Sequence, residues 1–244
     1  MRGFGRVVAV TSLALEARIA RGAGVSVLCE HAAQLEAALA DAIAHGATGI
    51  ISFGIAGGLA SELAAGDWVV ASRVRMGDEM LPTDCVWSRN LLAALPGAIH
   101  AEIVGSDILL PTPAEKKALH TRTGAAVVDM ESHIAARVAA RHSIPFAACR
   151  VVIDSAHRSL PPLADIALRP DGTPDIPAVC RSVLRDPTQL PDLLRAGIDA
   201  WIARRALQVG RNRLGAGLGF PALRVGHPEF ARPQHAESVA RVTA

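Results

Sequence analysis

The strongest constraint on the fold is a series of short apolar runs that alternate with helical patterns. Residues 49–53 (GIISF) form an unbroken apolar run, which is typical of a strand buried on both faces of a sheet. Residues 32–45 instead place Leu35, Leu39 and Ile43 at i, i+4 and i+8, which predicts an amphipathic helix. Further strands are predicted at residues 6–10, 24–29, 68–71, 101–104, 126–129 and 146–153, and further helices after residue 12, at 113–121, after 129 and at 191–207. This alternation predicts an α/β fold of three layers, with a central, mostly parallel or mixed sheet flanked by helices on both faces.

Length and composition favour one large domain. The chain has 244 residues, half of them hydrophobic, which is enough to bury a substantial core. We expect a single domain over residues 1–212 and a loosely ordered C-terminal tail over 213–244. Residues 159–177 contain five prolines and predict a long irregular loop.

Charge and cysteine content exclude several classes of protein. A net charge of +2 and an aromatic content of 3% predict no surface for binding nucleic acid. The four cysteines are widely spaced and form no CxxC pair, so we expect neither a metal site nor a disulfide framework. They are Cys29, Cys85, Cys149 and Cys180.

The N-terminal stretch and the predicted C-terminal helix bear on the location of the protein in the cell. Glu16 and Arg18 interrupt the apolar N-terminal stretch, so no signal peptide is predicted, and we expect a cytoplasmic protein. The C-terminal helix predicted at 191–207 is amphipathic and basic, and could rest on the inner membrane, on its own domain or on a second subunit. Its basic and apolar side chains include Arg195, Arg204, Arg205, Leu194, Trp201 and Leu207.

Four polar or glycine-rich positions follow predicted strands. They are Glu16, the stretch 54–58 (GIAGG), Glu131 and Asp154. Ligands of open α/β sheets bind at the carboxyl ends of strands, where these positions are predicted to lie. Each could instead be an ordinary helix cap, a salt-bridge partner or, for the glycines, a tight packing point. Their combination favours one functional site.

Three blocks of sequence resemble the superfamily of purine nucleoside phosphorylases and methylthioadenosine/adenosylhomocysteine nucleosidases. They are residues 49–70 (GIISFGIAGGLASELAAGDWVV), 128–135 (VDMESHIA) and 150–155 (RVVIDS). The segments LALEARIA, VDMESHIAARVA, AHRSLPP and ALRPDG are more closely similar to the hopanoid-associated phosphorylases of bacteria, which are implicated in removing adenine from adenosylhopane. The resemblance implies the nucleoside phosphorylase fold, homo-oligomers and no organic cofactor, with phosphate as a conceivable co-substrate.

The resemblance also implies roles for individual residues. Asp154 would protonate or hydrogen-bond N7 of the departing purine, and Glu16 would activate water. Glu131 would accept hydrogen bonds from the ribose hydroxyls, with Met130 packed against the sugar. The purine would be bordered by Asp107, Ile108 and Leu109, and the nucleophile or phosphate would lie near Gly54, Ala56, Gly57 and Arg18.

Two departures from the phosphorylases leave the acceptor open. Ile55 stands where phosphorylases commonly have a phosphate-binding serine, and Ser52 stands where some have an arginine. These residues favour hydrolysis, whereas the name of the similar family implies phosphorolysis. Arg18 and Arg73 could still bind phosphate or form surface salt bridges.

The preferred hypothesis is cleavage of an adenine nucleoside, most specifically adenosylhopane. Its long hydrophobic 5′ extension would need an apolar groove, which the proline-rich loop could line or could merely cover. The loop residues in question are Leu160, Pro161, Pro162, Leu163 and Ile166. The alternatives are a general methylthioadenosine/adenosylhomocysteine nucleosidase and a non-catalytic nucleoside-binding module.

Overall fold

The computed structural model describes residues 6–30, 32–160 and 190–221. Its strands are β1 (Val7–Val10), β2 (Val25–Leu28), β3 (Gly49–Gly58), β4 (Trp68–Met76), β5 (Glu79–Pro82), β6 (Ile99–Gly105), β7 (Val127–Asp129) and β8 (Phe146–Asp154). Its helices are α1 (Ala14–Ala20), α2 (Ala32–Ala44), α3 (Cys85–Ala94), α4 (Pro113–Thr123), α5 (Ser132–Arg141), α7 (Leu190–Leu214) and the short 3-10 helix η2 (Ala216–Gly219).

The strands form one mixed sheet. Its order is β2-β1-β3-β7-β6-β4-β5, and β8 pairs with both β3 and β4. β3 runs parallel to β1 and β8 but antiparallel to β7, which makes the sheet mixed as predicted. Because β8 joins β3 to β4, the strands β3, β7, β6, β4 and β8 close into a ring, a feature that the apolar runs alone did not predict.

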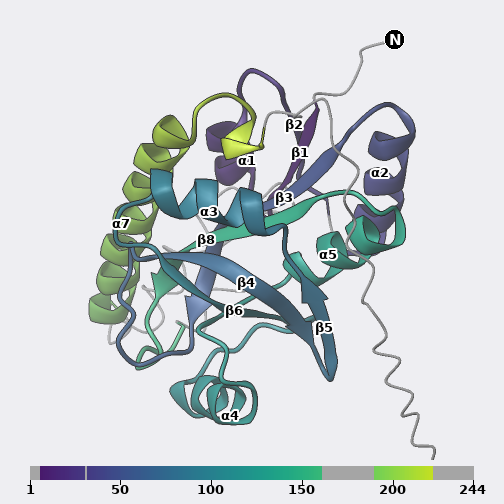
Figure 1. The fold of residues 1–244 in the computed structure, drawn as a ribbon. Coiled ribbons are helices and arrows are strands. Elements are labelled where there is room, and N and C mark those ends of the chain that lie inside the picture. Colours follow the sequence, from purple (N-terminus) through teal and green to yellow (C-terminus); the bar gives the residue numbers. More distant parts are fainter. Residues whose placement is uncertain (1–5, 31, 161–189, 222–244) are drawn as a thin grey trace, which may run out of the picture.

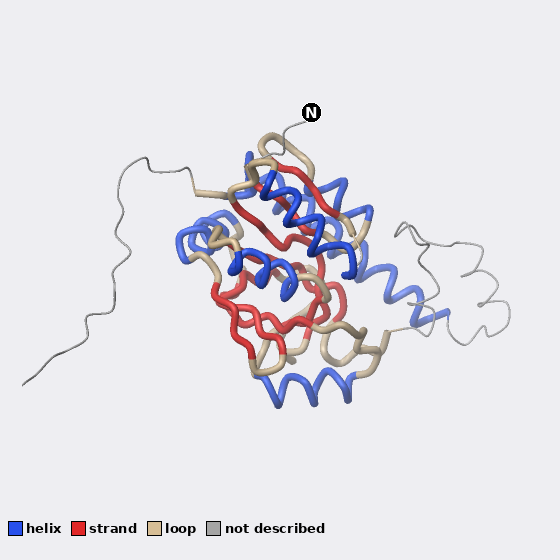
Figure 2. Tube along the Cα trace, turned by 90° about the vertical axis from the view of Figure 1, so that its right-hand side faces the viewer, coloured by secondary structure: helices blue, strands red, loops and turns tan. Residues whose placement is uncertain are grey.

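Helices cover both faces of the sheet (Figures 1 and 2). α2 and α5 bury Leu35, Leu39 and Val138 against one face, in a core that also contains Ile50 and Ile103. The other face packs against α1, α3 and α7 in a second core cluster, while α4 lies at one end of the molecule (Figure 1). The predicted three-layer α/β fold with a central sheet flanked by helices is therefore confirmed.

The predicted glycine-rich turn at residues 54–58 is wrong, because this stretch continues β3. On one edge, this stretch forms backbone pairs with β8, and at its end Gly57 and Gly58 pair with β7 on the other edge. A Cβ atom on Gly58 would lie 2.9 Å from the carbonyl oxygen of Asp154. The glycines are therefore needed for close approach of neighbouring backbone and side chains, not for a change of chain direction.

Several element boundaries also differ from the prediction. β4 extends five residues past the predicted end at residue 71, and β5 and α3 were not predicted. α3 does carry a start signal, since the Asp84 side chain accepts hydrogen bonds from the backbone N–H groups of Val86 and Trp87.

The C-terminal boundary predicted at residue 212 is too early. α7 continues to Leu214, and η2 follows with Leu218 fully buried. Trp87 Nε1 donates a hydrogen bond of 2.9 Å to the Leu218 carbonyl, and Phe220 packs edge-on against the Trp87 ring. Residues 213–221 therefore belong to the domain. The remainder of the predicted tail, and the proline-rich loop beyond Leu160, lie outside the described residues.

Candidate active site

Arg150 is the centre of a buried cluster of charges. It lies on β8, opposite Gly54 of β3, and its side chain is fully buried. Its Nε lies 2.6 Å from Asp129 Oδ2, and its Nη2 lies 3.2 Å from Glu131 Oε2. The sequence analysis did not single out Arg150. A signal was present, because an arginine inside the apolar run 146–153 must find buried partners.

Glu16 reaches the same cluster from α1. Its Oε2 accepts hydrogen bonds from the backbone N–H groups of Ser12 (2.8 Å) and Leu13 (3.0 Å), and its Oε1 accepts one from Ile55 (2.8 Å). A Cβ atom on Gly54 would lie only 2.7 Å from Glu16 Oε1 and 2.8 Å from Arg150 Nη1. Gly54 therefore lets the carboxylate and the guanidinium approach β3 together.

Asp129 and Glu131 divide two tasks at the start of α5. Asp129 Oδ1 accepts a hydrogen bond of 3.0 Å from the Ser132 N–H, so Asp129 caps the start of α5. Glu131 makes no capping hydrogen bond, and its side chain turns to Arg150 instead. Ser52 and Ser132 complete the cluster through a 2.9 Å hydrogen bond between their hydroxyl oxygens.

The cluster contains more acidic than basic groups. Burial raises the pKa of Glu16 and of Glu131, and Arg150 opposes the shift in both. Burial alone would lower the pKa of Arg150, but the carboxylates of Asp129, Glu131 and Glu16 raise it. One guanidinium thus faces three carboxyl groups, a setting in which a carboxylate is a stronger base than in water.

Asp154, at the end of β8, forms a second buried ion pair with Lys116 of α4. Lys116 Nζ also donates hydrogen bonds to the carbonyl oxygens of Ser155 (3.1 Å) and Arg158 (3.0 Å). Burial raises the pKa of Asp154, while Lys116 opposes the shift. Lys116 was missed because α4 is a largely polar helix and nothing in its sequence marks one lysine as buried.

The two ion clusters lie along one strand. Gly57 of β3 pairs with Val128 of β7 on one edge and with Asp154 on the other, three residues beyond Gly54. A Cβ atom on Gly57 would lie 3.5 Å from Asp154 Oδ1. The structure therefore brings Glu16, Glu131, Asp154 and the stretch 54–58 to one part of the sheet.

Most of the remaining predicted residues lie on two segments beside this part of the sheet, namely Asp107, Ile108, Leu109 and Met130. The Ser106 N–H donates a hydrogen bond of 2.9 Å to the Asp129 carbonyl, which holds the segment after β6 beside the end of β7. Asp107 Oδ1 lies 3.2 Å from Nε2 of the buried His133. Three apolar side chains on these two segments are exposed: Ile108, Leu109 and Met130.

Arg18 does not join the cluster. It is exposed on α1, two residues from the buried Glu16, and residues so spaced do not share a helix face. Arg73 Nε lies 2.8 Å from Glu102 Oε2. Among the described residues, no group of three or more His, Cys, Asp or Glu side chains could hold a metal ion.

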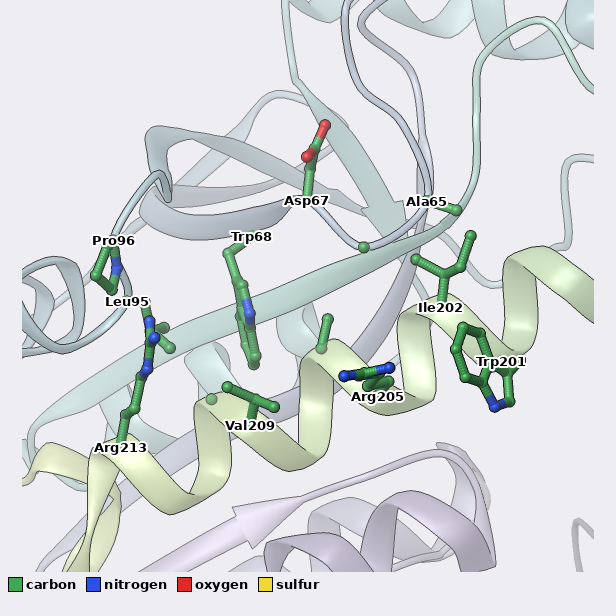
Figure 3. Close-up of a pocket in the computed structure, with 13 residues that line it drawn as sticks. Ala65, Asp67, Trp68, Leu95, Pro96, Trp201, Ile202, Arg205, Val209 and Arg213 are labelled. Carbon is green, nitrogen blue, oxygen red and sulfur yellow. The ribbon is translucent and has the colours of Figure 1, made fainter.

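A groove of about 460 Å³ lies elsewhere, between α7 and the segments around Trp68 and Leu95 (Figure 3). None of the predicted site residues lines it. We place the chemistry at the charged clusters, because the groove contains no comparable set of buried ionisable groups.

Comparisons with known proteins agree with the fold. Residues 102–171 match the family model described as Phosphorylase superfamily. The structure superposes on the 5′-methylthioadenosine/S-adenosylhomocysteine nucleosidase of Campylobacter jejuni with a TM-score of 0.63 and 12% identity, covering 86% of this chain and 96% of that one. The chain therefore has the same fold as that enzyme.

Two enzymes of Helicobacter pylori are similar to the same degree. Its futalosine hydrolase gives a TM-score of 0.62 at 13% identity over 85% of this chain and 94% of that one. Its 5′-methylthioadenosine/S-adenosylhomocysteine nucleosidase was solved with butyl-thio-DADMe-Immucillin-A. That structure gives a TM-score of 0.62 at 12% identity, covering 87% of this chain and 97% of that one. No curated protein sequence matches this chain.

Proposed function

We propose that this protein hydrolyses the N-glycosidic bond of an adenine nucleoside, and that adenosylhopane is its preferred substrate. The observation that carries the proposal is the pair of buried ion clusters along β3, with Glu16 and Glu131 around Arg150 and Asp154 on Lys116. Cleavage of this bond passes through a ribosyl cation and releases a purine anion, so it needs anionic groups on one side and a proton donor on the other.

Asp154 is the proposed proton donor. Its Oδ2 is held by Lys116, which leaves Oδ1, over Gly57, for N7 of the purine. Burial raises the pKa of Asp154, and a raised pKa favours the protonated form that a general acid needs. As the bond from C1′ to the purine nitrogen breaks, its electron pair passes to the base and the Asp154 proton passes to N7.

Glu16 is the proposed base for water. A carboxylate has about four acceptor positions, and three backbone N–H groups already occupy those of Glu16. The remaining position can accept a hydrogen bond from one water, whose oxygen adds to C1′ while its proton passes to Glu16. The products are free adenine and the 1-hydroxy sugar.

The charge balance supports water rather than phosphate as the acceptor. Asp129, Glu131 and Glu16 surround Arg150, and the phosphate candidates Arg18 and Arg73 are exposed or paired elsewhere. A phosphate dianion would enter a region with surplus negative charge, where like charges repel. Support also comes from the neighbouring structures, whose names are those of nucleosidases and a hydrolase.

The sugar and its extension are assigned to the two segments that carry Ile108, Leu109 and Met130. Glu131 accepts hydrogen bonds from the ribose hydroxyls, and Met130 packs against the ribose. Ile108 and Leu109 are exposed apolar side chains, which suits them to contact the base or a hydrophobic 5′ substituent. One neighbour was solved with a compound whose name includes a butylthio group, so this fold accepts an apolar extension in that relative.

The decisive experiment follows free adenine by chromatography after incubation with adenosylhopane, with methylthioadenosine and with adenosylhomocysteine, each with and without phosphate. We expect adenine release without phosphate and the highest kcat/KM for adenosylhopane. The sugar product, identified by mass spectrometry, should carry no phosphate.

Each other outcome contradicts a stated part of the proposal. Higher kcat/KM for the two thioether nucleosides would make the protein a general methylthioadenosine/adenosylhomocysteine nucleosidase. Strict dependence on phosphate would overturn hydrolysis. If calorimetry detected nucleoside binding but no adenine were released, the protein would be a non-catalytic nucleoside-binding module.

A further inference from the structure

The helix α7 exposes a row of apolar side chains to solvent. The row, named here the outward stripe, consists of Leu190, Leu194, Ile198, Trp201 and Val209. Their exposed fractions lie between 44% and 60%, although such side chains are usually buried. Successive members are separated by multiples of about one helical turn, so they share one face of the helix.

The outward stripe is separate from the face by which α7 packs on the domain. Ala203, Leu207 and Leu214 are buried on that second face, in the core cluster that contains Trp68. α7 therefore has two apolar faces, of which the described part of the domain covers one. α7 thus packs on its own domain, as one alternative from the sequence had it, but the described residues leave the outward stripe exposed.

Positive charge flanks the outward stripe. Its arginines are Arg195, Arg204, Arg205 and Arg213, and Arg205 lies 5.6 Å from the centre of the Trp201 ring. The acidic residues of α7 are Asp192, which pairs with Arg195 at 3.2 Å, and the buried Asp199, which pairs with Arg158 at 3.1 Å. The exposed surface of the helix is thus cationic around an apolar centre.

We propose that the outward stripe of α7 docks this protein on an anionic lipid surface. An apolar row with an interfacial tryptophan and flanking arginines is the pattern of helices that lie in the plane of a membrane interface. The charge favours lipid over a second copy of this chain, because stripe-to-stripe packing would bring the arginines of both copies together. The lipid phosphates would instead neutralise them.

The groove beside the stripe extends this surface. Trp201, Arg205, Val209 and Arg213 of α7 line the groove together with Trp68 and Pro96. In Figure 3, Val209 lies below Trp68, and Trp201 lies further along α7. Two guanidinium groups at the edge of a hollow of about 460 Å³ suit a phosphate headgroup. None of the described helices is long and apolar enough to cross a membrane, so the contact proposed is peripheral.

The test is sedimentation of the full chain with lipid vesicles. One set contains phosphatidylglycerol and phosphatidylcholine, and the other contains phosphatidylcholine alone. We expect binding to the anionic vesicles, weaker binding to the neutral ones, and loss of the difference in high salt. Trp201 is exposed whereas Trp68 and Trp87 are buried, so a blue shift of tryptophan fluorescence on binding reports on α7.

Matched variants distinguish binding through the outward stripe from non-specific adsorption to vesicles. The double variant Arg204→Gln/Arg205→Gln should weaken binding to anionic vesicles roughly 30-fold. Ile198→Ser/Trp201→Ser should weaken binding to both sets. Two controls, at exposed positions away from α7, are Met80→Ser and Arg122→Gln, and neither should change binding. Circular dichroism checks that every variant remains folded.

Three results would overturn the proposal. The first is no sedimentation with either vesicle set, and the second is equal binding by the stripe variants and wild type. The third is a dimer in sedimentation velocity that the stripe variants dissociate, which would identify a second copy as the occupant. None depends on adenine release, so the proposal can fail or hold independently of the proposed function.

Discussion

The two ion clusters along β3 differ in how many acidic groups surround the buried cation. In both, the cation is buried and one carboxylate keeps about a tenth of its surface open: 11% for Glu131 beside Arg150, and 13% for Asp154 beside Lys116. Arg150 is shared among three acids from two segments, whereas Lys116 faces Asp154 and two backbone carbonyl groups. One cluster therefore has a surplus of acidic groups, and in the other cluster one acid meets one base.

The two cations also differ in what they can do. A guanidinium stays protonated in proteins and holds carboxylate oxygens in a fixed plane, whereas the ammonium group of a lysine is a compact point charge. In the Arg150 cluster, this fixed positive charge favours the ionised forms of the carboxyl groups around it, which suits the cluster to face a sugar cation. The Lys116–Asp154 pair is suited to holding and releasing a proton. The following predictions test this division.

Removing the shared cation should have the largest effect. Arg150→Met leaves three buried carboxyl groups without compensation, and should lower the free energy of unfolding by about 3–5 kcal/mol. Chemical denaturation measures the change. The control is Arg141→Met, whose partner Glu36 lies 2.7 Å away on the surface, and which should cost less than about 1 kcal/mol. Similar losses in both variants would contradict the central place given to Arg150.

Neutralising the open carboxylates should affect catalysis more than stability. Asp154→Asn and Glu131→Gln should each lower kcat for adenine release by on the order of 10²-fold or more, because each removes a group proposed to act on substrate. Steady-state assays by chromatography measure this. Asp41→Asn, an exposed acid on α2, should leave kcat unchanged. Wild-type rates in both test variants would refute the assigned roles.

The sequence predicted the parts of this site that follow from local pattern. Apolar runs located most of the strands, and the acids at their ends were found because ligands bind there. Glu16, Glu131 and Asp154 were singled out on this basis and lie along β3. Their roles came from the resemblance, and they stay predictions until the assays are done.

The counter-charges could not be found in the same way. Lys116 is one of two adjacent lysines in α4, and only the tertiary structure distinguishes it from the exposed Lys117. The glycines at 54–58 suggested a turn because the local signal for a turn is the same as that for close approach. Close approach is recognised at Gly54 only because Glu16 and Arg150 lie against it, and both residues are far from Gly54 in the sequence.

The glycine assignment can itself be tested. Gly54→Ala would place a methyl group against Glu16 and Arg150, so it should lower the free energy of unfolding by about 1–3 kcal/mol. Gly197→Ala is the matched control, because a Cβ atom there meets nothing within 4 Å on an exposed part of α7. It should stabilise the protein by about 0.5–1 kcal/mol. Opposite signs in thermal or chemical denaturation would support close approach, and equal effects would contradict it.

The subtlest test concerns the proton on Asp154. As a general acid Asp154 must be protonated, so activity falls as the pH rises through its pKa. Lys116 lowers that pKa against the effect of burial, and Lys116→Met should therefore raise it. The falling limb of kcat/KM against pH should move to higher pH, whereas the exposed neighbour Lys117→Met should leave it in place. If Lys116 served only to hold the fold, its loss would reduce the active fraction at every pH without moving the limb. An unmoved limb would thus remove the distinction drawn between the two clusters.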